Sequence, residues 1–253
     1  MTIDLQNNII YGPINSRRLG LSLGINLLPR KFKVCPFNCV YCQYGFTNIV
    51  GLKPNFNKSI LPNINEIEKA IEIGIKANPG VDYITFSGNG EPTAHPDFPS
   101  LVDIAISLRN KFNPSARTAI LSNSATVSEP SIVKALNHLD CRFMKLDSGD
   151  ETTFKRFNRP HKSITFESII IGLAQMRDIV IQALFAGGEH GNSSKECIKS
   201  WIRAIGEIKP KECHIYSLDR PSPDNLLYKL SHSELANIMD KTESEINIPI
   251  HIF

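Results

Sequence analysis

The chain has 253 residues, of which 42% are hydrophobic and 21% charged, and its formal net charge at neutral pH is +3. These values are those of a globular protein with a large core, and so small a charge gives no argument for nucleic-acid binding. The N-terminus lacks a secretory pattern and no stretch approaches membrane-spanning length, so we expect a cytoplasmic protein with no membrane partner.

Apolar runs of strand type alternate along the chain with segments of helical period. Ile67, Ile71 and Ile75, for example, recur at helical spacing, and Pro79 and Gly80 stop that helix. In chain order, the expected elements are a strand at 21–28, a helix at 65–77, a strand at 83–87, a helix at 98–112, a strand at 118–122, a helix at 129–139, a strand at 142–146, a helix at 166–177, a strand at 179–185, a helix at 194–208, a strand at 213–217, a helix at 231–245 and an edge strand at 246–253.

About six strand–helix units predict an α/β protein, with a parallel sheet covered by helices. Ser231 and Glu234 form the pattern of a capping box for the last helix, and Pro249 favours an edge position for the final strand. No linker, charge block or repeat divides the chain. We therefore expect one domain over 1–253, with an N-terminal cap at about 1–20 and a C-terminal helix and edge strand at about 231–253.

Three cysteines, Cys35, Cys39 and Cys42, lie within eight residues at the spacing C-x3-C-x2-C. In a reducing cytoplasm such cysteines favour metal binding over disulfides. A structural zinc site takes four protein ligands, whereas three close cysteines suit a [4Fe–4S] cluster with one iron open to a small molecule. A zinc site completed by a distant histidine and unliganded thiols remain the alternatives.

This spacing, with Tyr41 directly before the last cysteine, resembles the cluster motif of the radical S-adenosylmethionine (SAM) enzymes. The resemblance implies a [4Fe–4S] cluster on the three cysteines, SAM bound at its open iron with Tyr41 on the adenine side, and reductive cleavage of SAM to methionine and a 5′-deoxyadenosyl radical. It also implies a partial (β/α)6 TIM-like barrel and a reductant such as flavodoxin or ferredoxin.

The segment Gly88, Asn89, Gly90 and Glu91 follows the strand at 83–87. It resembles the glycine-rich segment that holds the amino group of SAM in this family. Glycines at a strand end let backbone groups approach a ligand closely. An ordinary glycine-rich turn is the alternative, and Glu91 either helps to hold SAM or structures the turn.

Polar residues end the next two strands. In the family, residues at a place comparable to Ser122 and Asn123 reach the ribose or carboxylate of SAM, and a local turn is the alternative. Lys145 and Asp147 flank Leu146, so strand alternation sends both to one face. We expect that face to be the barrel interior, where the pair would face SAM or the substrate as candidate catalytic residues; on the outer face it would be a solvated ion pair.

Two later segments carry weaker candidates. Glu189 and His190 are candidate acid–base groups, in a segment expected to be a flexible loop. Arg220 is a candidate catalytic residue that binds a substrate carboxylate or phosphate, or else forms a structural ion pair with Asp219 or with another residue. The remaining cysteines have no motif spacing and are expected to be core thiols: Cys141, Cys197 and Cys213.

Motifs over nearly the whole chain look like a group of bacterial and archaeal radical SAM proteins related to the 4-demethylwyosine synthases, which modify tRNA. These motifs are 12–20, 22–26, 37–45, 88–93 and 215–221. The wyosine enzymes carry further cysteines ahead of the motif, whereas the 34 residues before Cys35 contain none. This difference weakens the tRNA assignment.

Basic residues cluster near the cysteine loop: Arg17, Arg18, Arg30, Lys31 and Lys33. They suit phosphates, but few aromatic residues accompany them for base stacking, namely Tyr41, Tyr44 and Phe46. Arg17 and Arg18 could equally bind an acidic small molecule or close one end of the barrel. We therefore expect a small molecule, peptide or protein residue as substrate ahead of tRNA. A wyosine-type tRNA synthase and a non-catalytic iron–sulfur or zinc protein are the alternatives.

Overall fold

A computed structural model of the chain describes residues 2–51 and 60–253, and its centre is one eight-stranded sheet. In spatial order the strands are β1 (Ile10–Ser16), β2 (Gly20–Ile25), β5 (Tyr83–Phe86), β6 (Arg117–Ser122), β7 (Cys141–Lys145), β8 (Val180–Leu184), β10 (Glu212–Tyr216) and β12 (Ile250–Ile252). β1 pairs antiparallel with β2, and all the other pairs are parallel. Two short pairs lie outside it: β3 (Val34–Cys35) with β4 (Ile49–Val50), and β9 (Ala186–Gly188) with β11 (Leu227–Lys229).

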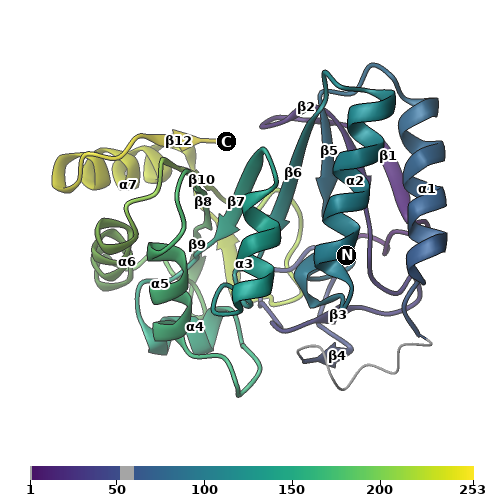
Figure 1. Cartoon of the computed structure of the whole chain (residues 1–253). Coiled ribbons are helices and arrows are strands. Elements are labelled where there is room, and N and C mark those ends of the chain that lie inside the picture. Colours follow the sequence, from purple (N-terminus) through teal and green to yellow (C-terminus); the bar gives the residue numbers. More distant parts are fainter. Residues whose placement is uncertain (1, 52–59) are drawn as a thin grey trace.

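Helices follow one another around the outer side of this sheet (Figure 1). They are α1 (Ile64–Ala77), the short 3₁₀ helix η3 (Pro92–Ala94), α2 (Phe98–Phe112), α3 (Pro130–Asn137), α4 (Glu151–Phe157), α5 (Phe166–Ala174), α6 (Lys195–Ile208) and α7 (His232–Glu245). Six parallel strands, each followed by at least one α-helix, form the partial barrel, so the expected α/β fold class is confirmed. None of the helices in the described ranges combines the length and apolar character needed to cross a bilayer.

Several boundaries differ from expectation for local reasons. The segment expected as an N-terminal cap supplies β1 to the sheet. β2 ends at Ile25 because the Asn26 side chain bonds to both backbone groups of Leu28 (3.1 and 3.3 Å) and turns the chain. The short helix α4 and the β9–β11 pair were not expected. The capping box of Ser231 and Glu234 and the edge strand β12 are confirmed.

Trp201 fixes α6 against the carboxyl end of the barrel. Its side chain is fully buried, and its ring packs edge-on against Phe185 at a centroid distance of 5.1 Å. Its indole N–H donates to the Leu146 carbonyl (2.9 Å), one residue before Asp147. Gly149 allows this approach, since a Cβ there would lie 2.0 Å from the Trp201 nitrogen. The outer helix therefore supports the end of β7.

Replacing Trp201 by alanine should lower the free energy of unfolding by about 3–5 kcal/mol, because it leaves a large cavity and an unpaired carbonyl. Trp201 is the only tryptophan in the sequence, so its replacement removes the tryptophan fluorescence signal. Urea unfolding is therefore followed by circular dichroism. Ile171→Ala is the control. That side chain is 52% exposed, and we expect a loss within about 0.5 kcal/mol. Equal losses in the two variants would contradict the assignment.

Candidate functional site

A cavity of about 630 Å³ lies on the inner side of the sheet. The six parallel strands of the barrel contribute Ser22, Gly24, Thr85, Leu121, Lys145, Gln182, Leu184 and Tyr216 to its wall. The cysteine loop contributes Tyr41 and Cys42, and the glycine-rich turn contributes Gly88 and Gly90. The cavity wall therefore combines the strand ends, the cysteine loop and the glycine-rich turn, which the sequence analysis identified as separate candidate segments. Its volume is typical of small-molecule sites.

The three motif cysteines come together in one loop beside the carboxyl ends of the strands, with Cys35 buried and Cys39 and Cys42 half-buried. Two of the sulfurs accept hydrogen bonds from side-chain amides. Asn123 donates to Cys35 Sγ (3.4 Å), and Asn158 donates to Cys39 Sγ (3.5 Å). Amide donors to thiolate sulfur are a common feature of iron–sulfur sites and tune their reduction potential.

Lys33 is almost completely buried among these cysteines. Burial opposes its charged form, but Cys42, Cys35 and Cys39 together raise its pKa. Burial is also the largest cause that raises the pKa of Cys39 to about 11, so binding a metal there must displace a proton. Within residues 2–51 and 60–253, no three His, Cys, Asp or Glu side chains are grouped to hold a metal ion. In a [4Fe–4S] cluster each cysteine binds a different iron. A buried cation, amide donors and three thiols on one loop fit such an anionic group.

The glycine-rich turn touches the cysteine loop through its backbone. Gly90 forms an isolated β-bridge with Val34, and a Cβ on Gly90 would lie 1.8 Å from the Val34 carbonyl oxygen. Gly90 has φ +152° and Gly88 has φ +130°, conformations that favour glycine. A Cβ on Gly88 would lie 2.6 Å from the Asn26 side chain. Gly90 is therefore needed to bring the turn against the cysteine loop, and Gly88 to bring it against the end of β2.

Asn89 does not line the cavity. Its buried side-chain amide donates to the carbonyls of Gln6 and Pro29, each at 2.9 Å, and its oxygen accepts from the Gln6 backbone N–H (2.7 Å). The side chain thus fastens the N-terminal segment over the turn.

Glu91 joins the ends of β5 and β6. Its buried carboxylate accepts from both the backbone and the hydroxyl of Thr93, from the Ser122 hydroxyl (2.9 Å) and from the Asn123 backbone N–H (2.6 Å). Burial raises the pKa of Glu91, although the hydrogen bonds from these donors act to lower it. Glu91, Ser122 and Asn123 are absent from the cavity wall. This arrangement favours the turn-structuring alternative for Glu91, and it points the Asn123 amide at Cys35.

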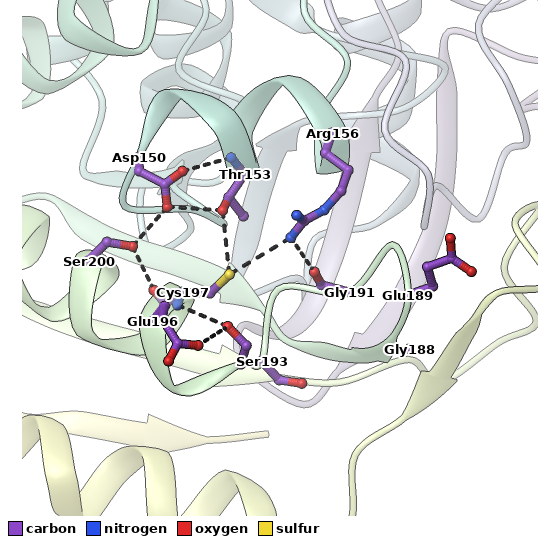
Figure 2. A pocket seen from close by; sticks show the side chains of 11 residues that line it. Asp150, Thr153, Arg156, Gly188, Glu189, Gly191, Ser193, Glu196, Cys197 and Ser200 are labelled. Carbon is purple, nitrogen blue, oxygen red and sulfur yellow. Dashed lines mark hydrogen bonds between the residues drawn. The ribbon is translucent and has the colours of Figure 1, made fainter.

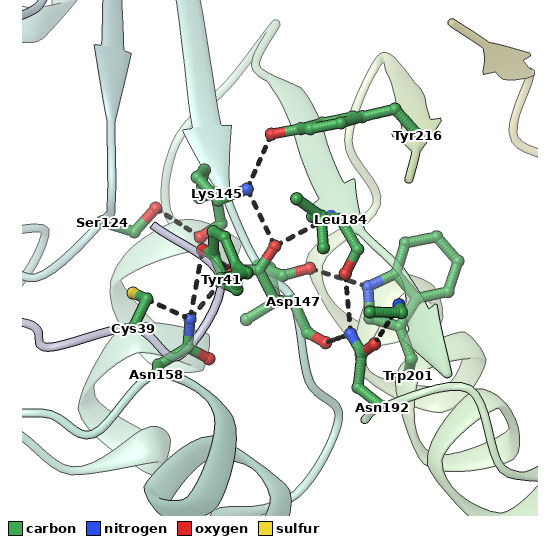
Figure 3. Close-up of polar contacts among 12 residues, drawn as sticks. Cys39, Tyr41, Ser124, Lys145, Asp147, Asn158, Leu184, Asn192, Trp201 and Tyr216 are labelled. Atoms are coloured by element: carbon green, nitrogen blue, oxygen red, sulfur yellow. Dashed lines mark hydrogen bonds and ion pairs between the residues drawn. The ribbon is translucent and has the colours of Figure 1, made fainter. Parts of the chain in front are cut away.

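Lys145 and Asp147 face the interior as a buried ion pair, with Nζ and Oδ1 2.9 Å apart (Figure 3). Lys145 also donates to the Tyr216 hydroxyl (2.8 Å) and reaches the cavity wall, whereas the Asp147 side chain is 1% exposed and lies behind it. Burial opposes the charge of Lys145, but Asp147 beside it raises its pKa above the usual value. The alternative of a solvated ion pair on the outer face of the sheet is therefore wrong.

Asp147 binds three further groups from different parts of the chain (Figure 3). The Tyr41 hydroxyl, the Asn158 amide (2.8 Å) and the Leu184 backbone N–H (2.9 Å) all donate to it. One carboxylate thus links the cysteine loop, α4 and β8 to β7.

The end of β10 brings further polar groups to the cavity. Tyr216, Asp219 and Arg220 line it, and Arg220 is exposed. Asp219 pairs with Arg17 and with Lys229 (3.4 Å). The expected alternative of an Arg220–Asp219 pair is therefore wrong within the described residues.

Glu189 and His190 lie outside this cavity. His190 Nδ1 is 2.7 Å from an oxygen of Asp224, a hydrogen-bond contact that fixes the ring. Glu189 lines a second cavity of about 550 Å³ between α4 and α6 (Figure 2). Neither residue is placed to serve the chemistry of the first cavity.

The second cavity is built from helix-capping and packing contacts (Figure 2). Asp150 caps α4 by accepting from the Thr153 backbone N–H (2.8 Å), and the Cys197 thiol contacts the Thr153 hydroxyl (3.4 Å) and Arg156 (3.8 Å). The other two cysteines outside the motif begin β7 or lie within β10, as expected of packing thiols: Cys141 and Cys213.

Sequence reasoning missed two asparagines of the site. Asn158 ends the short helix α4, which showed no clear helical pattern, and nothing in its neighbourhood signals that it touches both Cys39 and Asp147. Asn26 directly follows β2, but it lay inside the strand expected at 21–28, and its place in the motif at 22–26 gave it no role.

Residues 31–192 match the model of the radical SAM superfamily. The chain belongs to this superfamily. UPF0026 protein MJ1312 of Methanocaldococcus jannaschii is 30% identical over 226 residues, which are 87% of this chain and 66% of that protein. The chain thus covers slightly less than two thirds of that relative's length.

Solved radical SAM structures share the fold. A structure of TYW1 with a lysine–pyruvate adduct bound has a TM-score of 0.60 and 16% identity, over 88% of this chain and 73% of that one. Streptococcus suis SuiB bound to SAM has a TM-score of 0.62 and 17% identity, over 91% of this chain and 50% of that one. The expected resemblance to the superfamily, wyosine synthases included, is confirmed at the level of fold.

Gly90→Ala should lower stability by at least about 1–3 kcal/mol, since the new Cβ meets the Val34 carbonyl and the backbone is strained. We also expect less iron per chain after anaerobic reconstitution with iron and sulfide, because the cysteine loop must shift. Urea unfolding and an iron assay measure the two effects. Gly80→Ala, where a Cβ meets nothing within 4 Å, is the matched control; identical behaviour of the two variants would refute the close approach.

Asp147→Asn should cost about 3–5 kcal/mol of stability, because it leaves the Lys145 ammonium buried without its partner. The double variant Lys145→Met/Asp147→Asn should lose less than this single variant, since no unpaired charge remains. Urea unfolding gives both values. The exposed carboxylate change Glu72→Gln serves as control and should change stability far less than Asp147→Asn does. A double variant that loses as much as the single one would contradict the paired arrangement.

Proposed function

We propose that this chain is a radical SAM enzyme that cleaves SAM reductively and starts radical chemistry on a small substrate held in the same cavity. The observation that carries the proposal is the backbone contact between Gly90 and Val34, which places the glycine-rich turn and the cysteine loop together at one cavity. Cys35, Cys39 and Cys42 would hold a [4Fe–4S] cluster, which supplies the electron that cleaves SAM.

The protein's own share is binding, orientation and shielding. Gly88 and Gly90 leave their backbone at the cavity wall, where the methionine end of SAM would lie beside Cys42. Tyr41 is held on the wall by its bond to Asp147 and by packing against Phe157, at a centroid distance of 4.9 Å. Its ring is thus fixed where the adenine of SAM is proposed to lie.

Lys145 is the polar group best placed toward a substrate. Its ammonium reaches the cavity wall, and Asp147 and Tyr216 hold it from two sides. Because Asp147 raises its pKa, Lys145 is a cation at neutral pH that orients an electron-rich group or donates a proton to it. Asp147 acts through Lys145 and Tyr41 as a positioning residue.

A small substrate fits better than tRNA. The cavity of about 630 Å³ must hold SAM together with the reacting part of the substrate. The basic residues near the cysteine loop do not form one phosphate-binding surface. Lys33 is buried under the cysteines, Arg17 and Arg30 form ion pairs with carboxylates, and Arg18 turns into the cavity. The electron donor would be a small protein such as flavodoxin or ferredoxin.

The test is anaerobic formation of 5′-deoxyadenosine from SAM by the reconstituted chain and a strong reductant. The wild-type protein should form it, and Cys39→Ala should lose it completely together with most of its iron. Cys141→Ala, which removes a thiol outside the loop, should retain both. Cleavage of SAM by Cys39→Ala would refute the proposal. Wild-type protein that binds a cluster but no SAM in calorimetry would favour a non-catalytic iron–sulfur protein.

A further inference from the structure

The main cavity carries an excess of positive charge. Its wall includes one acidic residue, Asp219, and four basic ones: Arg17, Arg18, Lys145 and Arg220. Arg17 is paired with Asp219, and Lys145 with Asp147 behind the wall. Among the described residues, Arg18 and Arg220 have no ion pair, and Arg220 lies exposed. Arg18 is therefore the inward-facing cation of this wall that has no counter-charge.

Packing fixes the position of Arg18. It lies in the turn between β1 and β2, directly before Leu19, which is 5% exposed. Leu19 packs into a small apolar cluster inside the barrel, formed with Ala119, Phe143 and Val180. The Arg18 guanidinium carbon lies 4.5 Å from the ring centroid of Tyr216 and 5.7 Å from that of Phe253. The turn and two aromatic rings thus hold the guanidinium in place.

One nitrogen of this guanidinium, Nη1, is buried and has no hydrogen-bond partner in the described part of the chain. A buried donor without an acceptor is costly, and more so when the group is charged. Carboxylate and phosphate oxygens match the fork of a guanidinium, which binds them through two parallel hydrogen bonds. Nη1 itself is closed off from the cavity, so an anionic ligand oxygen at this wall would meet the rest of the guanidinium, which lines the cavity and has no ion pair among the described residues.

This position differs from the proposed place of SAM. Gly88 and Gly90 follow the carboxyl end of β5, and Cys42 lies in the loop beside them. The Arg18 guanidinium instead packs on Tyr216, the last residue of β10, and three strands separate β10 from β5 in the sheet. The carboxylate of SAM, bound near the cysteine loop, would leave Arg18 to a second molecule.

We propose that Arg18 binds a carboxylate or phosphate group of the substrate and so makes anionic small molecules the substrate class. The assignment of that molecule as the radical substrate rests on the proposed function. The anion fixes one end of the substrate, while Lys145 and the SAM-binding end of the cavity face the rest. Arg18 is thus a specificity-determining residue.

Calorimetric titrations of the reconstituted full chain, with and without saturating SAM, test this assignment. The probes are malonate, inorganic phosphate and the neutral analogue malonamide. Wild-type protein should bind malonate or phosphate saturably, also when SAM is bound, and should not bind malonamide. Arg18→Gln should weaken the anion by roughly tenfold or more. Arg203→Gln removes the same charge from an exposed position on α6 and should bind as the wild type does.

Equal anion affinity in Arg18→Gln and wild type would overturn the assignment, as would displacement of the anion by SAM or binding of neither anion. Arg18→Lys keeps the positive charge but lacks the planar guanidinium, so it should bind the anion with intermediate affinity. If Arg18→Gln does not fold, Arg18→Lys still allows the comparison with the wild type. Whichever of malonate and phosphate binds more tightly identifies the anionic group. The titrations without SAM do not depend on SAM cleavage, so a failure of the proposed function would remain distinguishable.

Discussion

The buried carboxylate of Asp147 is the interaction on which the site depends. It accepts from the cysteine loop through Tyr41, from α4 through Asn158 and from the backbone of β8, while it neutralises Lys145 on β7. Asn158 in turn donates to Cys39. A buried charge is tolerated only when it is paired and hydrogen-bonded, so these elements hold one another in position. The loop that carries the cysteines is thereby fixed to the barrel.

Close backbone packing completes the same end of the barrel. The glycine-rich turn lies against Val34, and Glu91 ties this turn to the end of β6. At the open side of the sheet, the β1–β2 turn reaches the end of β10 through the Arg17–Asp219 pair. One cavity results, with the cysteine loop near the carboxyl ends of the strands and Arg18 at the turn before β2. We propose that SAM and the substrate occupy different places in this cavity.

Much of the fold could be predicted from the chain because hydrophobic period reports local structure directly. The six parallel strands, their order of strand and helix, the capping box at Ser231 and the final edge strand all follow from short segments. The N-terminal strand and α4 did not, since β1 is mostly exposed and contains Gly12 and Pro13, and α4 has only seven residues. For the site, Cys35 to Cys42 and the glycine-rich turn were visible as motifs, whereas the side-chain positions of Asn89 and Glu91 were not.

The sequence by itself determined the superfamily and the residue types available for chemistry, because cysteine spacing and glycine at strand ends are local requirements. Only the tertiary structure decided what each polar side chain contacts. It paired Lys145 with Asp147 inside the barrel, bound the Asn89 side chain to the N-terminal segment and placed Arg18 in the cavity wall without an ion pair among the described residues. These outcomes depend on long-range packing and on the competition among donors for buried acceptors, which residue spacing does not encode.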